Sequence, residues 1–533
     1  MTDLFVEPAW VEVAARTDLA AAPEAGVPRR WAVVATGLLL ALAFPPFDLG
    51  PLALVAPLPL VMRWMHAPGG ARRAAVDGFI AGAVFFAVLL AWSWYFGVVA
   101  YFPFVIVLAL YWAAAGGLVG ALASRGVRGP WVVAAAWVVF EALRGRWPLG
   151  GFSWGEVGYA YHDVPAMRSV AAWGGVLAVS FVSVLVTACL AEAIVRWRGG
   201  VRSAARRPLS VALAAVAVVG LAHVGVPETR DAGTLRVAIV QGNDRNRQLS
   251  AGEIRERFLP ESHFELAGGL ERPLDLVVLP ESSLDEDPRV DPSLDRRLGA
   301  LARRLDASVL SNAAVEIENG ERLHNTTFWH DPSGELSGTY IKRHLVPFGE
   351  YVPGRQFLGF VDELDQIPRD HAPGSEPAIF TVRGAGGEEI DVGNLICFES
   401  AFTELARDYA ADGAEVLVVS TNNRSFRRSA NSSQHIAIGQ LRAAETGRSV
   451  VHAAVSGRSA LIDPDGDVTA TTGLFERATL DGMVSARTGR TPYVVAGDWV
   501  VLLAGAILVG AAWAARKGSG STPKRFARFR PRS

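Results

Sequence analysis

The chain has 533 residues, of which half are hydrophobic and only a fifth are charged, and its mean hydropathy is +0.25. This length exceeds one ordinary compact domain, and the hydropathy indicates a protein partly embedded in a membrane. The formal net charge of −2 argues against a nucleic-acid partner. With only two cysteines, Cys189 and Cys397, the composition also argues against a disulfide framework.

Residues 1–28 predict a disordered cytoplasmic N-terminus rather than a signal peptide, because acids are spread through them and no compact apolar segment follows a basic start. A membrane-spanning helix needs about 20 mostly apolar residues. Candidate spans lie near residues 31–47, 49–65, 76–98, 102–123, 130–143, 166–195, 209–226 and 496–515. We therefore expect a membrane domain of about seven helices over 29–227 and a last transmembrane helix over 494–516.

Basic residues gather in alternate connections between these spans. Arg29 and Arg30 precede the first span, and five arginines lie between residues 196 and 207. The positive-inside rule assigns such connections to the cytoplasm. The intervening domain, residues 228–493, is then predicted to lie on the extracytoplasmic face, and the basic tail at 517–533 returns to the cytoplasm.

From Leu235 onward, short β-rich runs alternate with helical runs and turns. The expected strands are Leu235–Gln241, Leu274–Leu279, Ser308–Ile317, Thr326–His330, Ile390–Phe398, Glu415–Ser420 and Val450–Ile462. The expected helices are Ile254–Leu270, Pro292–Leu305, Phe402–Ala411 and Ser433–Thr446. This alternation predicts a layered α/β domain.

Three reactive side chains stand out in this domain: Glu281, Lys342 and Cys397. Each alone has an ordinary structural explanation, as a surface carboxylate, a solvated amine or a core thiol. Glu281 and Cys397, however, follow the C-terminal ends of apolar strands, where α/β folds place their sites. A base, a cation and a thiol together supply what acyl transfer through a thioester requires.

Four motifs strengthen this interpretation. They are Val240-Gln-Gly-Asn, Leu279-Pro-Glu-Ser, the run from Lys342 through Pro-Phe-Gly-Glu to Pro353, and Ile396-Cys-Phe-Glu. These motifs resemble the landmarks of the nitrilase, or carbon–nitrogen hydrolase, superfamily. Together with Glu141-Ala-Leu-Arg-Gly and Arg442-Ala-Ala-Glu-Thr-Gly-Arg, they resemble more fully the apolipoprotein N-acyltransferase family, over nearly the whole chain after residue 30.

The resemblance implies a multi-span α-helical membrane domain carrying a nitrilase-like α-β-β-α sandwich in the bacterial cytoplasmic membrane. By similarity, the acyl donor is a phospholipid and the acceptor is the N-terminal diacylglyceryl-cysteine of a lipoprotein. The roles implied for individual residues are general base for Glu281, oxyanion stabiliser for Lys342, nucleophile for Cys397, a second oxyanion donor from the Phe398 amide, and support from Glu350 and Glu399.

Two other functions remain open at this point. A membrane-anchored amidase or nitrilase would use the same three residues with water as the acceptor, and a non-enzymatic transporter or scaffold would leave Cys397 inert. The sequence contains no metal-ligand spacing, nucleotide loop or cofactor motif, so no cofactor is expected. Residues 422–427 read Asn-Asn-Arg-Ser-Phe-Arg, where the family commonly has Asn-Asp-Ala-Trp-Phe-Gly.

Overall fold

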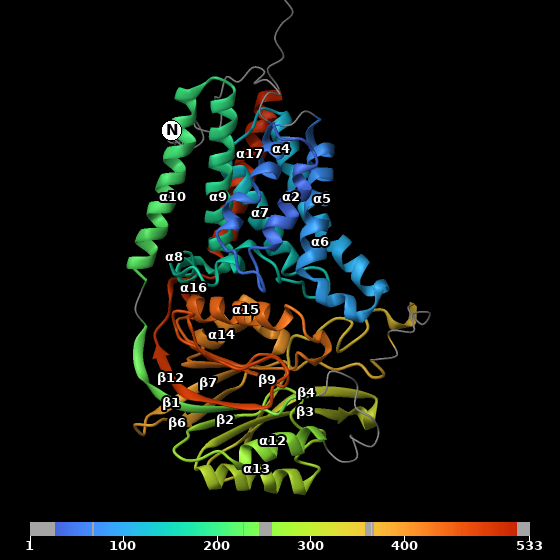
Figure 1. Cartoon of the computed structure of the whole chain (residues 1–533), viewed down its shortest axis with the longest axis vertical. Helices are drawn as coiled ribbons and strands as arrows, with labels where there is room; N and C mark the ends of the chain where they lie inside the picture. Colours follow the sequence, from blue (N-terminus) through green and yellow to red (C-terminus); the bar gives the residue numbers. More distant parts are fainter. Residues whose placement is uncertain are drawn as a thin grey trace, which may run out of the picture.

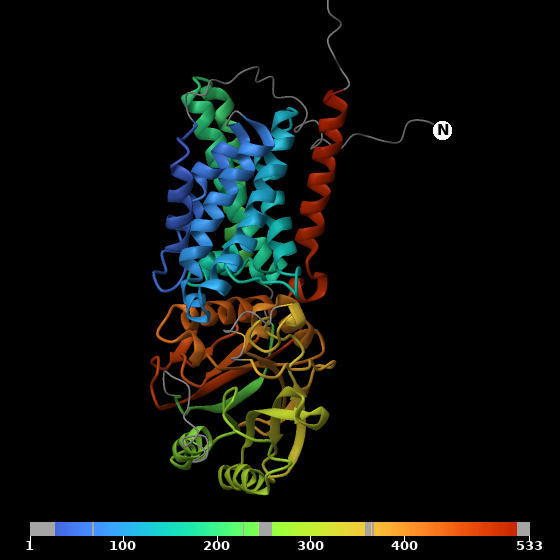
Figure 2. The same ribbon diagram turned by 90° about the vertical axis from the view of Figure 1, so that its right-hand side faces the viewer.

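The computed structural model describes residues 27–66, 69–226, 229–244, 258–357, 364 and 367–519. A bundle of helices is stacked on an α/β domain along the long axis of the molecule (Figures 1 and 2). The predicted disordered N-terminus and most of the basic tail lie outside the described residues. The polypeptide enters the α/β domain from one helix of the bundle and returns to the bundle with its last helix.

The helices of the bundle fall where the apolar segments predict them. They are α2 (Ala32–Ala41), α3 (Leu52–Val55), α4 (Leu58–His66), α5 (Gly70–Leu89), α6 (Val98–Ser124), α7 (Pro130–Arg144), α9 (Ala171–Arg198), α10 (Arg206–Val224) and α17 (Trp499–Ser519), with the short α8 (Pro165–Arg168) and α16 (Pro492–Ala496) at the domain junction. Four helical stretches in the described residues, 98–124, 171–198, 202–224 and 499–517, are long and apolar enough to cross a membrane. The total number of spans and their orientation stay predictions.

Glycines allow α5 and α6 to pack closely. A Cβ on Gly78 would lie 2.2 Å from the Trp112 carbonyl oxygen, and one on Gly116 would lie 2.5 Å from the Ala74 carbonyl oxygen. Small residues at such contacts bring helix backbones together, which is how helices gain packing energy inside a membrane.

The α/β domain contains two six-stranded sheets. The strands are β1 (Arg230–Gln241), β2 (Leu276–Val278), β3 (Ser308–Ile317), β4 (Arg322–His330), β5 (Leu336–Ile341), β6 (Ile379–Arg383), β7 (Glu389–Ile396), β8 (Val416–Thr421), β9 (Ser449–Ala454), β10 (Ala460–Ile462), β11 (Val468–Thr471) and β12 (Ala478–Thr488). The sheet orders are β12-β1-β2-β3-β4-β5 and β11-β10-β9-β8-β7-β6. In each sheet the three central strands are parallel, so their C-terminal ends share one edge.

Helices cover the outer face of each sheet. One apolar core joins the first sheet to α12 (Phe258–Gly268) and α13 (Pro292–Leu305), and another joins the second sheet to α14 (Thr403–Ala411) and α15 (Asn431–Thr446). A third core, which includes Ile239 and Val418, fills the space between the sheets. The α-β-β-α sandwich and the helical bundle confirm the predicted fold class.

Helix α15 joins the two parts of the molecule, lying directly beneath the bundle (Figure 1). The buried Gln434 side chain accepts hydrogen bonds from the indole N–H groups of Trp92 and Trp154, at 3.0 and 2.8 Å. Its amide nitrogen donates to the carbonyl oxygens of Pro45 and Leu89. One side chain of the α/β domain thus contacts three separate segments of the bundle.

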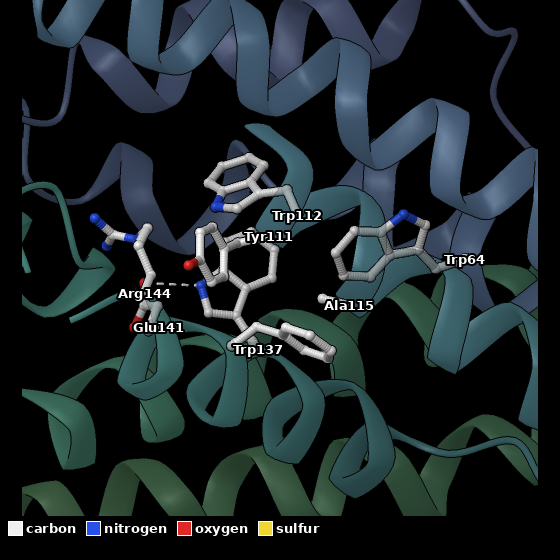
Figure 3. A pocket seen from close by; sticks show the side chains of 8 residues that line it. Trp64, Tyr111, Trp112, Ala115, Trp137, Glu141 and Arg144 are labelled. Carbon is white, nitrogen blue, oxygen red and sulfur yellow. Dashed lines mark hydrogen bonds between the residues drawn. The ribbon is translucent and has the colours of Figure 1, made fainter. Parts of the chain in front are cut away.

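Glu141 and Arg144 belong to a small polar cluster inside the bundle, beside a cavity lined mainly by aromatic side chains (Figure 3). Glu141 Oε1 accepts hydrogen bonds from the Trp137 indole and from the Val157 amide, each at 2.9 Å. Arg144 donates to the carbonyl oxygens of Phe152 and Trp154. The cluster therefore fixes the loop after α7, whose aromatic residues face the α/β domain.

Candidate active site

Glu281 follows β2 and is 6% exposed. Its Oε1 accepts hydrogen bonds from Asn325 Nδ2 at 2.7 Å and from Lys342 Nζ at 3.4 Å. Its Oε2 accepts one from the backbone N–H of Asn422, at 2.7 Å. These donors come from both sheets and hold the carboxyl group in one orientation.

Lys342 is the first residue after β5 and is 1% exposed. Its Nζ lies 2.9 Å from Glu350 Oε1, and Glu350 is fixed in turn by Asn325 Nδ2 and by the Val346 amide. A buried ammonium is tolerated only where carboxylates compensate it. Lys342 has two such partners, Glu281 and Glu350.

Cys397 follows β7 and has a φ of +53°, in the left-handed region that side chains other than glycine rarely occupy. Such strain marks sites where a side chain is presented by a sharp strand-to-helix turn. The short 3₁₀ helix Cys397–Ala401 completes the turn. The Thr421 hydroxyl donates to Sγ at 3.2 Å.

The electrostatics of the site favour a neutral thiol beside a charged amine. Burial raises the pKa of Cys397 to about 12, and Glu281 adds to the increase while Lys342 and Thr421 oppose it. Burial disfavours the charged form of Lys342, but Glu350 and Glu281 outweigh it and raise the Lys342 pKa. A reaction at the Cys397 sulfur would therefore need a base to remove the thiol proton, whereas the Lys342 amine is already charged.

Glu399 supports the chain segment that carries Lys342. Its completely buried side chain accepts hydrogen bonds from the Tyr340 hydroxyl and from the amides of Arg343, His344 and Ile396. Burial is the main reason that its pKa is raised. Glu399 thereby holds the residues after β5 against the turn after β7.

Phe398 connects the site to the bundle. Its ring lies 5.9 Å from that of Phe152 and 4.9 Å from that of Phe402, centre to centre. The Ser153 hydroxyl also donates to the Ala401 carbonyl oxygen at 2.7 Å. The turn that presents Cys397 is therefore packed on the helical bundle.

Comparison with known proteins agrees with this architecture. Residues 36–189 match the family model of the apolipoprotein N-acyltransferase N-terminal domain, and residues 236–493 match that of carbon-nitrogen hydrolases. The apolipoprotein N-acyltransferase of Geobacter metallireducens is 32% identical, with 91% of this chain and 95% of the relative covered. The chain belongs to the apolipoprotein N-acyltransferase family. The family member of Methylococcus capsulatus is 33% identical over 91% of this chain and 96% of its own.

Among solved structures, a CN-hydrolase superfamily protein from Xanthomonas campestris is similar at 19% identity and a TM-score of 0.37, covering 55% of this chain and 99% of its own.

Sequence motifs of the apolipoprotein N-acyltransferase family predicted the residues that the structure brings together: Glu281, Lys342, Glu350, Cys397, Phe398 and Glu399. The motifs missed three supporting residues, namely Asn325, Thr421 and His435.

His435 of α15 lies beneath the turn that carries Cys397. Its Nε2 is 2.7 Å from Ser400 Oγ and 3.2 Å from the Cys397 carbonyl oxygen, and its ring packs on Trp154. Burial lowers its pKa to about 4, so it is neutral at neutral pH. No sequence motif pointed to Gln434 or His435. Their contacts depend on the packing of α15 against the helical bundle, which the sequence does not reveal.

Proposed function

We propose that this protein transfers an acyl chain from a phospholipid to Cys397 and then to the α-amino group of a diacylglyceryl-cysteine at the N-terminus of a lipoprotein. The observation that carries the proposal is that Cys397, which Glu281 and Lys342 influence by their charges, lies on a turn packed against the helical bundle through Phe398 and Phe152. Both substrates carry long acyl chains, and extracting each buried CH₂ from the bilayer costs about 0.8 kcal/mol. A site at the membrane boundary avoids that cost.

In the first step, Glu281 takes the thiol proton as Sγ attacks the ester carbonyl carbon of the phospholipid. Lys342 and the Phe398 amide stabilise the resulting oxyanion. Glu281 then protonates the departing alcohol, so that a lysophospholipid leaves and a thioester remains on Cys397. Glu350 and Glu399 keep Lys342 and its segment in place throughout both steps.

In the second step, the lipoprotein amine attacks the thioester carbonyl carbon and Glu281 accepts the amine proton. Collapse of the tetrahedral intermediate forms the amide and expels the thiolate, which recovers its proton from Glu281. We place this chemistry in the domain of residues 228–493, on the extracytoplasmic face of the bacterial cytoplasmic membrane. The alternating arginines of the membrane connections support that orientation.

The test is intact-protein mass spectrometry of the detergent-purified enzyme after incubation with phospholipid, with Cys397→Ala alongside. We expect the mass of one acyl chain on the wild type, removable by hydroxylamine and missing from the variant. Addition of a diacylglyceryl-cysteine peptide should discharge the adduct into an amide. Hydrolysis of small amides without any lipid-derived adduct would instead favour the amidase function, and acylation of the variant would refute the nucleophile.

A further inference from the structure

The loop of residues 422–428 runs from the candidate active site to the helical bundle. At one end, the Asn422 amide donates to Glu281. At the other end, the Phe426 ring meets those of Trp92 and Phe96 edge-on, with centres 4.9 and 5.6 Å apart. These aromatic residues belong to the short 3₁₀ helix Ala91–Phe96 between α5 and α6. The loop is therefore held at both ends.

Arg427 lies beside exposed aromatic residues at the end of the bundle that faces the α/β domain. Its guanidinium carbon is 4.8 Å from the centre of the Tyr95 ring. Tyr95 and its neighbour Trp94 are 42% and 49% exposed at the outer end of the bundle. Exposed tryptophan and tyrosine side chains at the ends of membrane helices mark the interface between the hydrocarbon core and water.

The backbone at Arg427 is strained. Its φ of 51° and ψ of −152° fall in a region that is essentially restricted to glycine. A glycine would satisfy the same turn without strain. The turn conformation favours glycine, so it does not account for an arginine at position 427. We therefore look for a function of the Arg427 side chain.

Arg427 and its neighbour Arg428 have no carboxylate partner in the part of the chain that the structure describes. Within the described residues, Arg427 contacts the Tyr95 ring, while Arg428 stacks on Phe475 and makes one long hydrogen bond to a carbonyl oxygen. Arg424 of the same loop differs, because Asp244 neutralises it at 2.6 Å. Two adjacent positive charges thus stand in this loop without a carboxylate partner among the described residues, Arg427 on the side of the bundle and Arg428 on the side of Phe475.

We propose that Arg427 and Arg428 bind the head-group phosphate of the phospholipid acyl donor and give the enzyme a preference for donors with a net negative head group. This inference rests on the proposed function. A planar guanidinium donates two parallel hydrogen bonds to phosphate oxygens. In a zwitterionic lipid the ammonium already compensates the phosphate, so two uncompensated guanidinium groups favour an anionic head group such as phosphatidylglycerol.

The experiment measures acyl-enzyme formation at Cys397 in vesicles whose bulk lipid is ether-linked phosphatidylcholine, which has no ester to donate. Diacyl phosphatidylglycerol or diacyl phosphatidylethanolamine is added at increasing mole fraction. A basic residue near an anionic surface contributes about 1 kcal/mol, which is about fivefold in affinity. We expect Arg427→Gln and Arg428→Gln each to raise the half-saturating fraction of phosphatidylglycerol about fivefold, with the maximal rate unchanged.

The matched control is Arg383→Gln on the exposed edge strand β6, which should behave as the wild type. An unchanged lipid preference in the double variant would overturn the head-group site while leaving the thioester mechanism intact. Absence of acyl-enzyme with every donor would instead overturn the proposed function.

A third arm adds ether-linked phosphatidylglycerol to the phosphatidylethanolamine vesicles. If this lipid accelerates the wild type but not the double variant, the arginines sense the surface charge and not the donor, which would also overturn the proposal.

Arg427→Gly separates side chain from backbone. The glycine relieves the strained turn, so we expect a melting temperature equal to or above that of the wild type, together with the loss of phosphatidylglycerol preference seen for Arg427→Gln. A lower melting temperature with an unchanged preference would show that Arg427 is structural, which would contradict the proposal.

Discussion

The thiol of Cys397 is buried beside a carboxyl group, and both features keep it protonated. Two groups lower the pKa of the Cys397 thiol against these effects, namely Thr421 and Lys342. The Thr421 hydroxyl is the hydrogen-bond donor that contacts Sγ among the described residues, and Lys342 contributes through its charge. A donor to sulfur stabilises the thiolate more than the thiol, since hydrogen bonds to charged groups are the stronger ones. In the proposed mechanism, Thr421 is therefore a positioning residue for the Cys397 sulfur.

We predict that Thr421→Val slows thioester formation about 10- to 100-fold, because a hydrogen bond to a charged group contributes about 1.5–3 kcal/mol. The measurement is the single-turnover acylation rate, together with the pH dependence of Cys397 alkylation by iodoacetamide. The apparent thiol pKa should rise in the variant. Other charged groups that influence Cys397, namely Glu281, Lys342 and Glu350, are unchanged.

Thr421→Ser is the matched control, since it keeps the hydroxyl and should retain most of the rate. The idea fails if the valine variant alkylates with the wild-type pH profile. It also fails if serine and valine are equally slow, because the β-branched shape of Thr421 would then matter more than its donor.

At the scale of elements, α15 attaches the catalytic domain to the bundle, and Gln434 is the residue that tests this attachment. Gln434→Leu has similar volume but leaves two indole N–H groups and two carbonyl oxygens without their partner. Each buried group left unsatisfied costs about 1–3 kcal/mol. We expect a clear loss of thermal stability and of acyl-enzyme yield.

The control is Gln356→Leu on the exposed 3₁₀ helix Arg355–Phe357, which should leave the melting temperature nearly unchanged. Thermal unfolding is measured in detergent and followed by tryptophan fluorescence, to which Trp92 and Trp154 at the junction contribute. Equal melting temperatures for the two variants would show that α15 does not depend on Gln434 for its attachment.

The sequence predicted best those elements that are buried on at least one face. It located β3 and α13 at their observed bounds, and the continuous apolar runs of β2 and β8 were clear. It missed β5, β6, β11 and β12, where exposed and partly buried residues dominate. It also joined β9 to β10, which residues 455–459 separate, because both flanks are apolar.

The candidate site also contains residues that the sequence predicts and residues that only the fold reveals. Glu281, Lys342 and Cys397 stand in distinctive motifs, so the sequence could predict them. Asn325 lies mid-strand in β4 and supports the site only because β4 and β5 place it between Glu281 and Glu350. Such a role follows from sheet order and register, which no local pattern reports.

For the molecule as a whole, acid should weaken the fold through buried histidines of the α/β domain. Burial lowers the pKa of His263, His344 and His435 to about 4, and burial together with the neighbouring His435 holds the pKa of His452 well below its usual value. Between about pH 6.5 and pH 4 the unfolded chain binds these protons and the folded protein does not. The contribution of these histidines to stability is therefore complete above pH 6.5 and falls as the pH is lowered, by up to about 1.4 kcal/mol per pH unit for each histidine. Glu445, whose pKa burial raises to about 7, opposes part of this effect.

His452 offers the sharpest test of this pH dependence. Neither of its ring nitrogens has a hydrogen-bond partner in the described part of the chain, and its ring packs 4.7 Å from that of His435. His452→Leu removes a group that must stay neutral in the folded state without breaking a hydrogen bond. We expect wild-type-like stability at pH 7.5 and a smaller loss between pH 6.5 and pH 5, measured by thermal unfolding. A pH dependence identical to that of the wild type would place the acid sensitivity elsewhere, because His452 would then bind its proton equally in both states.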